Sequence, residues 1–351
     1  MSETDESLAL KNAFASAAAL GRADQERLYR LLKESLYPAS ASLDSVAKEV
    51  RERRFKDGIT CPHCTSAKTH LNGKAKGKQR YVCKDCQRSF GDFTNSPVSR
   101  TKYPELWMKH LQLMVEGATL KRVSQELDIH ISTAFFWRHK VLNGLKDLPL
   151  ELLNGVAEVD ETYFLESQKG KHKYRISHRK PRKRGEPSKL RGISREQVCV
   201  LVGRDREKHT IAKVVGMGQM TNKRAESNLS AGFGEVTALC TDSAGAYRNY
   251  ARNHEIHHYA LNTSKKVRVL KGIYHIQNVN AYHSRLKKWM DRFCGVSTKH
   301  MNNYLAWFHF VDDHGTQALR PKVMELLVSS AQQAVAQTYK MIKMTTLNLS
   351  A

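Results

Sequence analysis

Two Cys-x2-Cys pairs constrain the folding of this chain more than any other feature of its sequence. Cys61 and Cys64 form the first pair, Cys83 and Cys86 form the second, and eighteen residues rich in Lys and Gly separate them. Each Cys-x2-Cys turn aims two thiolates at one point, so two such turns close a tetrahedral shell around zinc. Four protein ligands leave no position for a substrate. We therefore predict a structural Zn²⁺ within a zinc ribbon over 57–98.

The seven cysteines are an odd number, which argues against a disulfide framework. Outside the paired set the cysteines stand in apolar or mixed surroundings. We expect buried, inert thiols at Cys199, Cys240 and Cys294. A zinc ribbon builds only a small core, which we expect three aromatic side chains to cover: Tyr81, Phe90 and Phe93.

The charge balance of the chain points to a polyanionic partner. Against 34 Asp and Glu stand 58 Lys and Arg, which gives a formal net charge of +24. Nucleic acid is the first candidate partner and an anionic membrane the second. No uninterrupted apolar run approaches the ~20 residues of a membrane span, and the acidic start MSETDESL is unlike a signal peptide. We expect a soluble cytosolic protein that binds nucleic acid and no membrane.

Helical patterns flank the cysteine pairs. Residues 1–56 show amphipathic stretches and are expected to form a helical arm that packs on its neighbours or pairs subunits. Three further helical patterns in 99–148 predict a helix-turn-helix DNA-binding domain. Gly117 is expected to end the first of these helices, Thr119 to cap the second and Ser132 to cap the third.

In a helix-turn-helix the last helix enters the major groove of DNA. Any small bundle of three helices shows the same spacing, so the adjacent zinc ribbon is what favours the DNA-reading interpretation. Four residues are expected on the outer face of this helix, against base edges or phosphates: Thr133, Arg138, His139 and Lys140.

After Pro149 the periodicity of the sequence changes from helical to extended. Over 149–310 we predict three strands, a helix, a strand, a helix, a short strand and a long helix. This order is typical of a ribonuclease-H-like α/β fold with a mixed sheet. Residues 311–351 are expected to form a helical C-terminal tail. The chain is therefore predicted to be multidomain, with a helical arm, a zinc ribbon, a helix-turn-helix and an α/β catalytic domain.

Two acidic residues of this half stand where metal chemistry needs them. Asp160 is expected near the end of the first strand and Asp242 closes the fourth, so neighbouring strands would bring both carboxylates to one edge of the sheet. Adjacent carboxylates repel unless a cation bridges them, and hard oxygen ligands suit Mg²⁺ or Mn²⁺. Two such ions activate a water or a 3′-hydroxyl for in-line attack on phosphate. Each aspartate alone is explained equally well as a cap of a turn.

Taken together, these motifs resemble a known family. Two Cys-x2-Cys pairs, a helix-turn-helix, EVDETYF, LCTDSAGAY and NVNAYHSRLKKWM are similar to bacterial insertion-sequence transposases with a zinc-ribbon N-terminus and a DDE-type core. The likeness covers about residues 57–310. It implies binding to terminal inverted repeats, followed by metal-dependent cleavage and strand transfer of DNA with two Mg²⁺ or Mn²⁺ per active site. It also implies a protein of the bacterial cytoplasm and nucleoid.

The resemblance assigns the metal ligands residue by residue. VDETYF places the first catalytic Asp on Asp160, and TDS places the second on Asp242. Most members carry Glu in the third position, where alignment of the SRLKK run sets Asn280 in this chain. An amide oxygen holds a metal less tightly than a carboxylate. The resemblance thus implies an Asp-Asp-Asn set, as in some branches of the family.

The last long helix of this region is predicted to be amphipathic. Its buried stripe is expected at Val279, Tyr282, Leu286 and Trp289. Its other face is expected at Asn280, His283, Ser284 and Lys287. His283 is a candidate to assist the metal or the leaving group, or else it lines a DNA groove. Lys287 is a candidate phosphate contact, or else a solvated lysine.

Between the first two strands lies a strongly basic insertion. Residues 169–191 carry eleven Lys or Arg and one acid, so they cannot fold by burial alone. We interpret the insertion as a clamp on DNA phosphates, with a solvated loop or a nuclear-type signal as alternatives. Its central residues are predicted DNA contacts: Arg179, Lys180, Arg182, Lys183 and Arg184.

Two rival functions stay open. A zinc-ribbon regulator with an inactive core would explain Asn280, although paired acids are costly without a use. A ribonuclease or Holliday-junction nuclease would explain the acids but neither the ribbon nor the recognition helix. A transposase must hold two element ends, so we expect at least a homodimer on double-stranded DNA, with the element ends and the target as partners.

Overall fold

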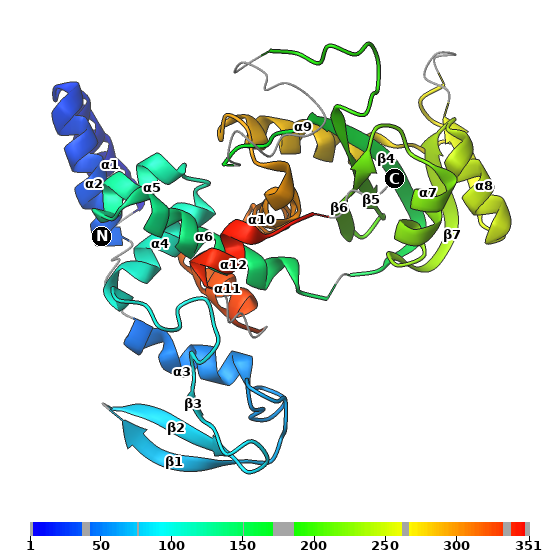
Figure 1. Cartoon of the computed structure of the whole chain (residues 1–351). Helices are drawn as coiled ribbons and strands as arrows, with labels where there is room; N and C mark the ends of the chain where they lie inside the picture. Colours follow the sequence, from blue (N-terminus) through cyan, green and yellow to red (C-terminus); the bar gives the residue numbers. More distant parts are fainter. Residues whose placement is uncertain are drawn as a thin grey trace.

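The computed structural model describes residues 3–36, 43–75, 77–149, 151–170, 186–261, 267–332 and 338–347. The chain forms a three-stranded sheet and a five-stranded sheet. In Figure 1 the small sheet lies at one end of the molecule, the large sheet lies at the other, and helices lie between them. The N-terminal helices α1 (Glu3–Ala18) and α2 (Arg22–Leu36) form a hairpin, which the Gln25 amide ties to the carbonyl oxygens of Ala17 and Ala18. No helix in these ranges is long and apolar enough to cross a lipid bilayer.

The small antiparallel sheet forms the ribbon, with strands β1 (Thr69–Ala75), β2 (Lys78–Cys83) and β3 (Ser89–Gly91). Tyr81 stacks on Phe90 in its core, with ring centroids 5.2 Å apart. Phe93 does not cover this core as expected, because it packs against the larger helical core instead.

Helix α3 (Leu43–Arg54) joins the ribbon to the helices. The guanidinium of Arg51 donates two hydrogen bonds to the carboxylate of Asp92, at 2.8 and 2.7 Å. Arg54 donates to the carbonyl oxygens of Asp92 and Thr94. The ribbon is thus docked on α3 by charge-assisted bonds to the segment just after β3.

Three helices follow in the predicted order: α4 (Trp107–Val115), α5 (Leu120–Leu127) and α6 (Ile131–Lys146). Gly117, with φ of 69°, follows the end of α4 as expected. The Thr119 hydroxyl accepts a hydrogen bond from the Arg122 N–H and caps α5, also as expected. The cap of α6 differs from the prediction. His130 occupies the N-cap position and accepts from the Ser132 N–H, so Ser132 lies within the first turn.

Helix α6 is buried on nearly every side. Two helices from the C-terminal part of the chain pack against it: α10 (Met301–Asp313) and α11 (Leu319–Gln332). Gly144 permits the close approach of α11, because a Cβ at this position would lie 2.2 Å from the carbonyl oxygen of Ser330. The predicted C-terminal tail therefore contributes a core helix, with the short α12 (Tyr339–Met344) after it.

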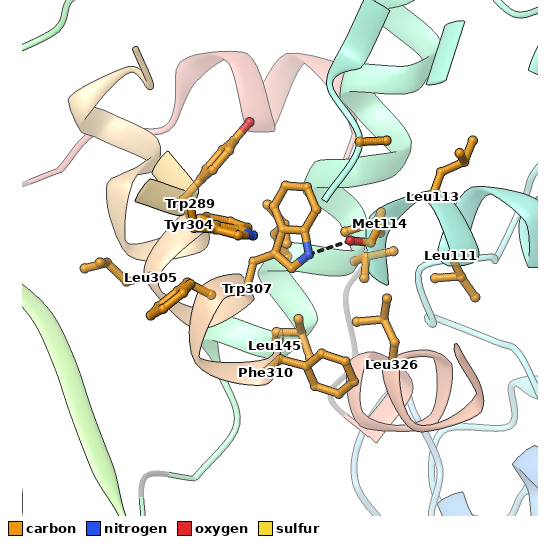
Figure 2. Packing of buried hydrophobic residues seen from close by; sticks show 14 of the residues in the cluster. Leu111, Leu113, Met114, Leu145, Trp289, Tyr304, Leu305, Trp307, Phe310 and Leu326 are labelled. Atoms are coloured by element: carbon orange, nitrogen blue, oxygen red, sulfur yellow. Dashed lines mark hydrogen bonds between the residues drawn. The ribbon is translucent and has the colours of Figure 1, made fainter. Parts of the chain in front are cut away.

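Trp307 of α10 lies at the centre of this helical core (Figure 2). Its indole Nε1 donates to the carbonyl oxygen of Met114 at 3.1 Å, and its ring meets Trp289 edge-on with centroids 5.0 Å apart. The same buried cluster continues to Val202 and Val214 on the large sheet. The segments predicted as separate helix-turn-helix and catalytic domains therefore share one hydrophobic core.

The large sheet is mixed and has the strand order β6-β5-β4-β7-β8. Strands β4, β5 and β6 pair antiparallel, whereas β4, β7 and β8 pair parallel. The strands are β4 (Leu153–Leu165), β5 (Gln197–Arg204), β6 (Thr210–Met217), β7 (Phe233–Asp242) and β8 (His257–Leu261).

Helices cover both faces of this sheet. Val159 and Leu201 pack toward α7 (Asn222–Leu229) and α8 (Gly245–Asn253), whereas Val200 packs toward α9 (Gln277–Asp291). This alternation follows from the two-residue period of a strand. In Figure 1, α7 and α8 lie on the outer side of the sheet and α9 and α10 on the inner side. The strands and helices follow the order predicted from the sequence.

Candidate zinc and active sites

Four cysteine sulfurs meet at one end of the ribbon. Cys61 Sγ lies 3.7 Å from Cys86 Sγ, Cys64 Sγ lies 3.6 Å from Cys83 Sγ, and all four atoms are within 4.8 Å of one another. Zn–S bonds of ~2.3 Å give S–S edges of ~3.8 Å in a tetrahedral site. The sulfur spacing therefore fits a zinc ion.

The remaining cysteines divide into two kinds. Cys199 and Cys240 are buried in strands of the large sheet, as expected. Cys294 is exposed, contrary to the expectation of a buried thiol. It follows α9 with φ of 50°, where the chain turns at the surface.

Asp160 and Asp242 occupy matching positions on neighbouring parallel strands. The pairing of β4 with β7 runs to Glu158 and Cys240, and each aspartate lies two residues further along its strand. A step of two residues returns to the same face, and neighbouring strands lie ~4.8 Å apart. Asp160 is not near the end of its strand as expected, because β4 continues to Leu165 in pairing with β5.

The environment of Asp160 disfavours a negative charge. Burial, the neighbouring Glu161 carboxylate and Asp242 raise the pKa of Asp160 to about 7, whereas Lys287 acts in the opposite direction. Glu161 faces away, toward α8, where it accepts a hydrogen bond from the Tyr247 hydroxyl at 2.5 Å. Two carboxylates held in a partly buried position would gain from a bound cation.

Helix α9 presents its polar face to this pair of aspartates. His283 Nδ1 lies 3.9 Å from Asp160 Oδ2. Burial and the charge of Lys287 lower the pKa of His283 to about 4, so the imidazole is neutral at pH 7. Asn280 lies one turn earlier and is exposed, as is Lys287 one turn later. The predicted buried stripe of α9 is also found, at Val279, Tyr282, Leu286 and Trp289.

The four cysteines form a complete set of metal ligands, whereas Asp160 and Asp242 are only two. Among the described residues, the four cysteines are the one group of three or more His, Cys, Asp or Glu side chains close enough to hold a metal. A third ligand beside Asp160 and Asp242 must therefore be another residue type or require side-chain movement. Asn280 is exposed on α9, one turn before His283.

Glu158 fixes the start of α9 against β4. Its carboxylate is fully buried and accepts hydrogen bonds from the backbone N–H groups of Asn278 and Val279, at 2.8 and 3.1 Å. The Asn278 amide donates a third bond at 2.7 Å. Because Ile276 at the N-cap offers no side-chain bond, a carboxylate from another element satisfies the free N–H groups of α9 and its dipole.

Two basic side chains complete the surroundings of Glu158. Arg206, from the β5–β6 turn, donates to the Glu158 carboxylate and, at 2.7 Å, to the carbonyl oxygen of Ile273. His275 Nδ1 lies 3.1 Å from Glu158 Oε1. Strand alternation places Glu158 on the face of Asp160, but neither Arg206 nor His275 stands out in the sequence. Glu158 is therefore a positioning residue for the helix that carries Asn280 and His283.

We expect Glu158→Gln to lower the free energy of unfolding by about 3 kcal/mol, because Arg206 then loses the buried charge it pairs with. Urea unfolding at pH 7 measures this change. Glu207→Gln is the matched control, because this carboxylate lies in the same turn and its side chain is 79% exposed. Equal stability of the two variants would contradict the positioning role.

The predicted recognition residues lie inside the molecule. The exposed fractions of Arg138, His139 and Lys140 are 1, 1 and 6%, so the expectation that they project outward is wrong. Arg138 donates to the carbonyl oxygen of Ala118 at 2.6 Å, and Lys140 donates to that of Ser99 at 2.8 Å. Tyr304 of α10 lies against Arg138 and His139, whereas Lys140 lies against Ser99 and Trp107.

The remaining predicted DNA contacts belong to the first turn of α6, to α9 and to the basic insertion. Thr133 is half-buried in the first turn of α6 and Lys287 is exposed on α9. The centre of the basic insertion lies outside the described residues, with its predicted contacts Arg179, Lys180, Arg182, Lys183 and Arg184.

Comparison with known proteins points to one class for this arrangement. Residues 152–313, which include the sheet, α9 and α10, match the family model of the ISXO2-like transposase domain. The chain is also 25% identical over 277 residues to an uncharacterized protein in transposable element ISH50 of Halobacterium salinarum. That alignment covers 73% of this chain and 85% of the relative. The fold, the paired aspartates and both likenesses support a transposase, and the relative's place in a transposable element supports one of the insertion-sequence kind.

Proposed function

We propose that this protein is a DDE-type DNA transposase with a ribonuclease-H-like core, which binds the terminal inverted repeats of its element and cuts and joins DNA. The observation that carries the proposal is the matched position of Asp160 and Asp242 within the segment that is similar to the ISXO2-like transposase domain. Asp242 Oδ1 also accepts a hydrogen bond from the Ala244 N–H at 3.0 Å, and Asp160 Oδ1 accepts one from the Glu161 N–H at 2.9 Å. These local bonds account for one oxygen of each carboxylate but not for the pairing of the two half-buried aspartates, which supports a metal site.

Asp160, Asp242 and Asn280 are proposed to hold Mg²⁺ or Mn²⁺, two ions per site. Bound ions would activate a water or 3′-hydroxyl and stabilise the leaving oxygen at phosphorus. The chain's own residues orient this site. Glu158 holds α9 in place, and the neutral imidazole of His283 lies 3.9 Å from the Asp160 carboxylate. The cysteine set is proposed to hold a structural Zn²⁺.

DNA is proposed to bind along the exposed basic surface and not through the buried residues of α6. Lys287 lies beside the aspartates, and the basic insertion at 169–191 is proposed to clamp phosphates near them. The helix-turn-helix role of α4 to α6 would then rest on its exposed edges. Because two element ends must be held together, the active form is proposed to be at least a homodimer.

The identity of the third ligand is tested by Asn280→Ala, which we expect to reduce strand transfer strongly while DNA binding persists. Asn280→Glu restores a carboxylate, but its extra methylene can misplace the metal, so its rate is expected between those of Asn280→Ala and wild type. The measurement is transfer of a labelled element end in Mg²⁺ and in Mn²⁺. Ser284→Ala, one turn along the same face, is the matched control. Full activity of Asn280→Ala would place the third ligand elsewhere, with His283 next to test.

A further inference from the structure

A second feature of the molecule lies apart from the aspartates. A cavity of about 470 Å³ opens between the start of α5, the first turns of α6, the connection from α9 to α10 and helix α12. Its volume falls within the range of about 300–1,000 Å³ typical of ligand pockets. Phe135 and Tyr339 contribute apolar wall, with ring centroids 6.3 Å apart.

The walls of this cavity carry charge of one sign. Five cationic side chains line it, and no Asp or Glu belongs to the lining in the parts of the chain that the structure describes. The five are Lys121, Arg138, Lys169, Lys299 and Lys343. The cavity between β6 and α10 differs in this respect, because Glu151 and Asp313 line it beside Lys213. The positive lining is therefore a property of one cavity and not only of a basic chain.

Two buried donors in these walls lack a hydrogen-bond partner among the described residues: Arg138 Nε and Ser297 Oγ. The side chain of Arg138 is buried, since the residue is only 1% exposed. Its Nη2 donates to the carbonyl oxygen of Ala118, whereas its Nε–H has no acceptor among the described residues. A buried donor without an acceptor costs about 1–3 kcal/mol. Such donors beside a cationic cavity are suited to an anion that brings acceptor oxygens.

The pKa values of two imidazoles in the cavity wall are lowered by burial and by neighbouring cations. His139 and His300 line the cavity with ring centroids 4.2 Å apart. Burial and the charge of Lys299 lower the pKa of His300 to about 4, and burial, His300 and Arg138 lower that of His139. Both rings are thus neutral at pH 7, so the lining keeps its cations without further repulsion.

We propose that this cavity receives a phosphate group of the bound DNA strand, an inference that rests on the proposed transposase function. The geometry of α9 links the two sites. His283 lies 3.9 Å from the Asp160 carboxylate, and α9 runs from there to Asp291, two residues before Phe293, which lines the cavity. The eight residues from His283 to Asp291 span about 12 Å of helix. A strand held at the aspartates therefore reaches the cavity within a few nucleotides, past Lys287.

The test measures how the affinity of the full chain for a labelled mixed-sequence DNA duplex depends on salt. Each phosphate contact contributes about −0.9 to the slope of log affinity against log salt. Lys121→Ala/Lys343→Ala is expected to make this slope shallower by about 0.9, because the cavity is proposed to receive one phosphate. Ser297→Val changes no charge but replaces the buried Oγ donor with a methyl group. The phosphate is then expected to leave the site and the slope to become shallower by about 0.9. The matched control is Lys213→Ala/Lys223→Ala, on β6 and α7, with the wild-type slope expected.

Thermal unfolding of each variant verifies folding. A wild-type slope in Ser297→Val, with a change in the lysine pair alone, would place the lysines on the surface and overturn the cavity site. Inorganic phosphate that stabilises wild type but not Ser297→Val, with equal DNA slopes, would assign the cavity to a free anion instead. If the wild-type protein transfers strands but neither variant changes the salt slope, the proposed phosphate site is wrong and the proposed transposase function stands. If wild type neither binds nor joins DNA, the proposed function fails.

Discussion

Asp160→Asn and Asp242→Asn are each expected to reduce cleavage and strand transfer by at least about a thousandfold, or about 4 kcal/mol of transition-state stabilisation. Either change removes one of the two charges proposed to hold the catalytic cations. DNA binding is expected to persist, because the carboxylates contribute metal charge and not phosphate contacts. Gel-shift and strand-transfer assays on the same preparations measure both quantities.

Measurement of the stability of each variant distinguishes loss of catalysis from misfolding. Burial and nearby carboxylates already raise the pKa of Asp160 to about 7, so loss of its charge is not expected to destabilise the fold when divalent cations are absent. Asp291→Asn is the control, because Asp291 is exposed at the end of α9, outside the site. An Asp160→Asn or Asp242→Asn variant that joins DNA at the wild-type rate would show that the paired aspartates are not the catalytic ligands.

Removal of zinc is expected to have the second large effect. Chelation, or Cys83→Ser, should unfold the ribbon and loosen α3, which docks on it through Arg51 and Asp92. Structural zinc contributes about 10–16 kcal/mol of apparent binding free energy in zinc-finger peptides, far more than the small core around Tyr81 and Phe90 can replace. Binding to the element ends is expected to weaken while the large sheet stays folded.

Limited proteolysis and circular dichroism, together with metal analysis of the purified protein, test this expectation. Cys294→Ser is the matched control, because its thiol is exposed and outside the cysteine set. It is expected to retain the zinc content and protease resistance of wild type. A purified protein free of zinc, whose end binding ignores chelators, would contradict the structural role.

Local patterns in the sequence predicted the parts of the fold that local chemistry decides. The cysteine spacing predicted a set of four close sulfurs, because a Cys-x2-Cys turn is geometrically self-contained. Strand periodicity and turn residues gave the order of elements around Asp160 and Asp242. The position of Asp160 within its strand was harder to predict, since the pairing partner that extends β4 to Leu165 comes from β5.

The burial of α6 depended on contacts that no local pattern contains. A pattern of outward polar residues at Arg138, His139 and Lys140 indicates a solvent-facing helix. Tyr304 of α10, more than 150 residues later, lies against Arg138 and His139. Arg138 and Lys140 donate to the backbone carbonyls of Ala118 and Ser99. The apolar residues Leu142 and Leu145, together with Gly144, were the local sign that α6 is buried on more than one side.

The candidate site divides in the same way. Asp160, Asp242 and Asn280 were predicted from the motifs of the resembling family, and His283 from helical spacing. The structure places His283 beside Asp160. The support of α9 by Glu158 and Arg206 joins segments more than a hundred residues and nearly fifty residues apart, and depends on burial that a sequence does not display. The proposed ligands can be recognised from local sequence motifs, whereas Glu158 and Arg206 become recognisable only from their tertiary contacts.

Sequencing of the DNA products is the most direct test of the proposed function. The purified protein is incubated with Mg²⁺, a DNA carrying the terminal repeats that flank its gene, and a plasmid target. We predict covalent junctions between the 3′ end of the element and the target strand, absent with Asp160→Asn. Hydrolysed ends without junctions would instead indicate a nuclease, and specific binding with intact DNA would indicate a regulator, each of which contradicts the transposase assignment.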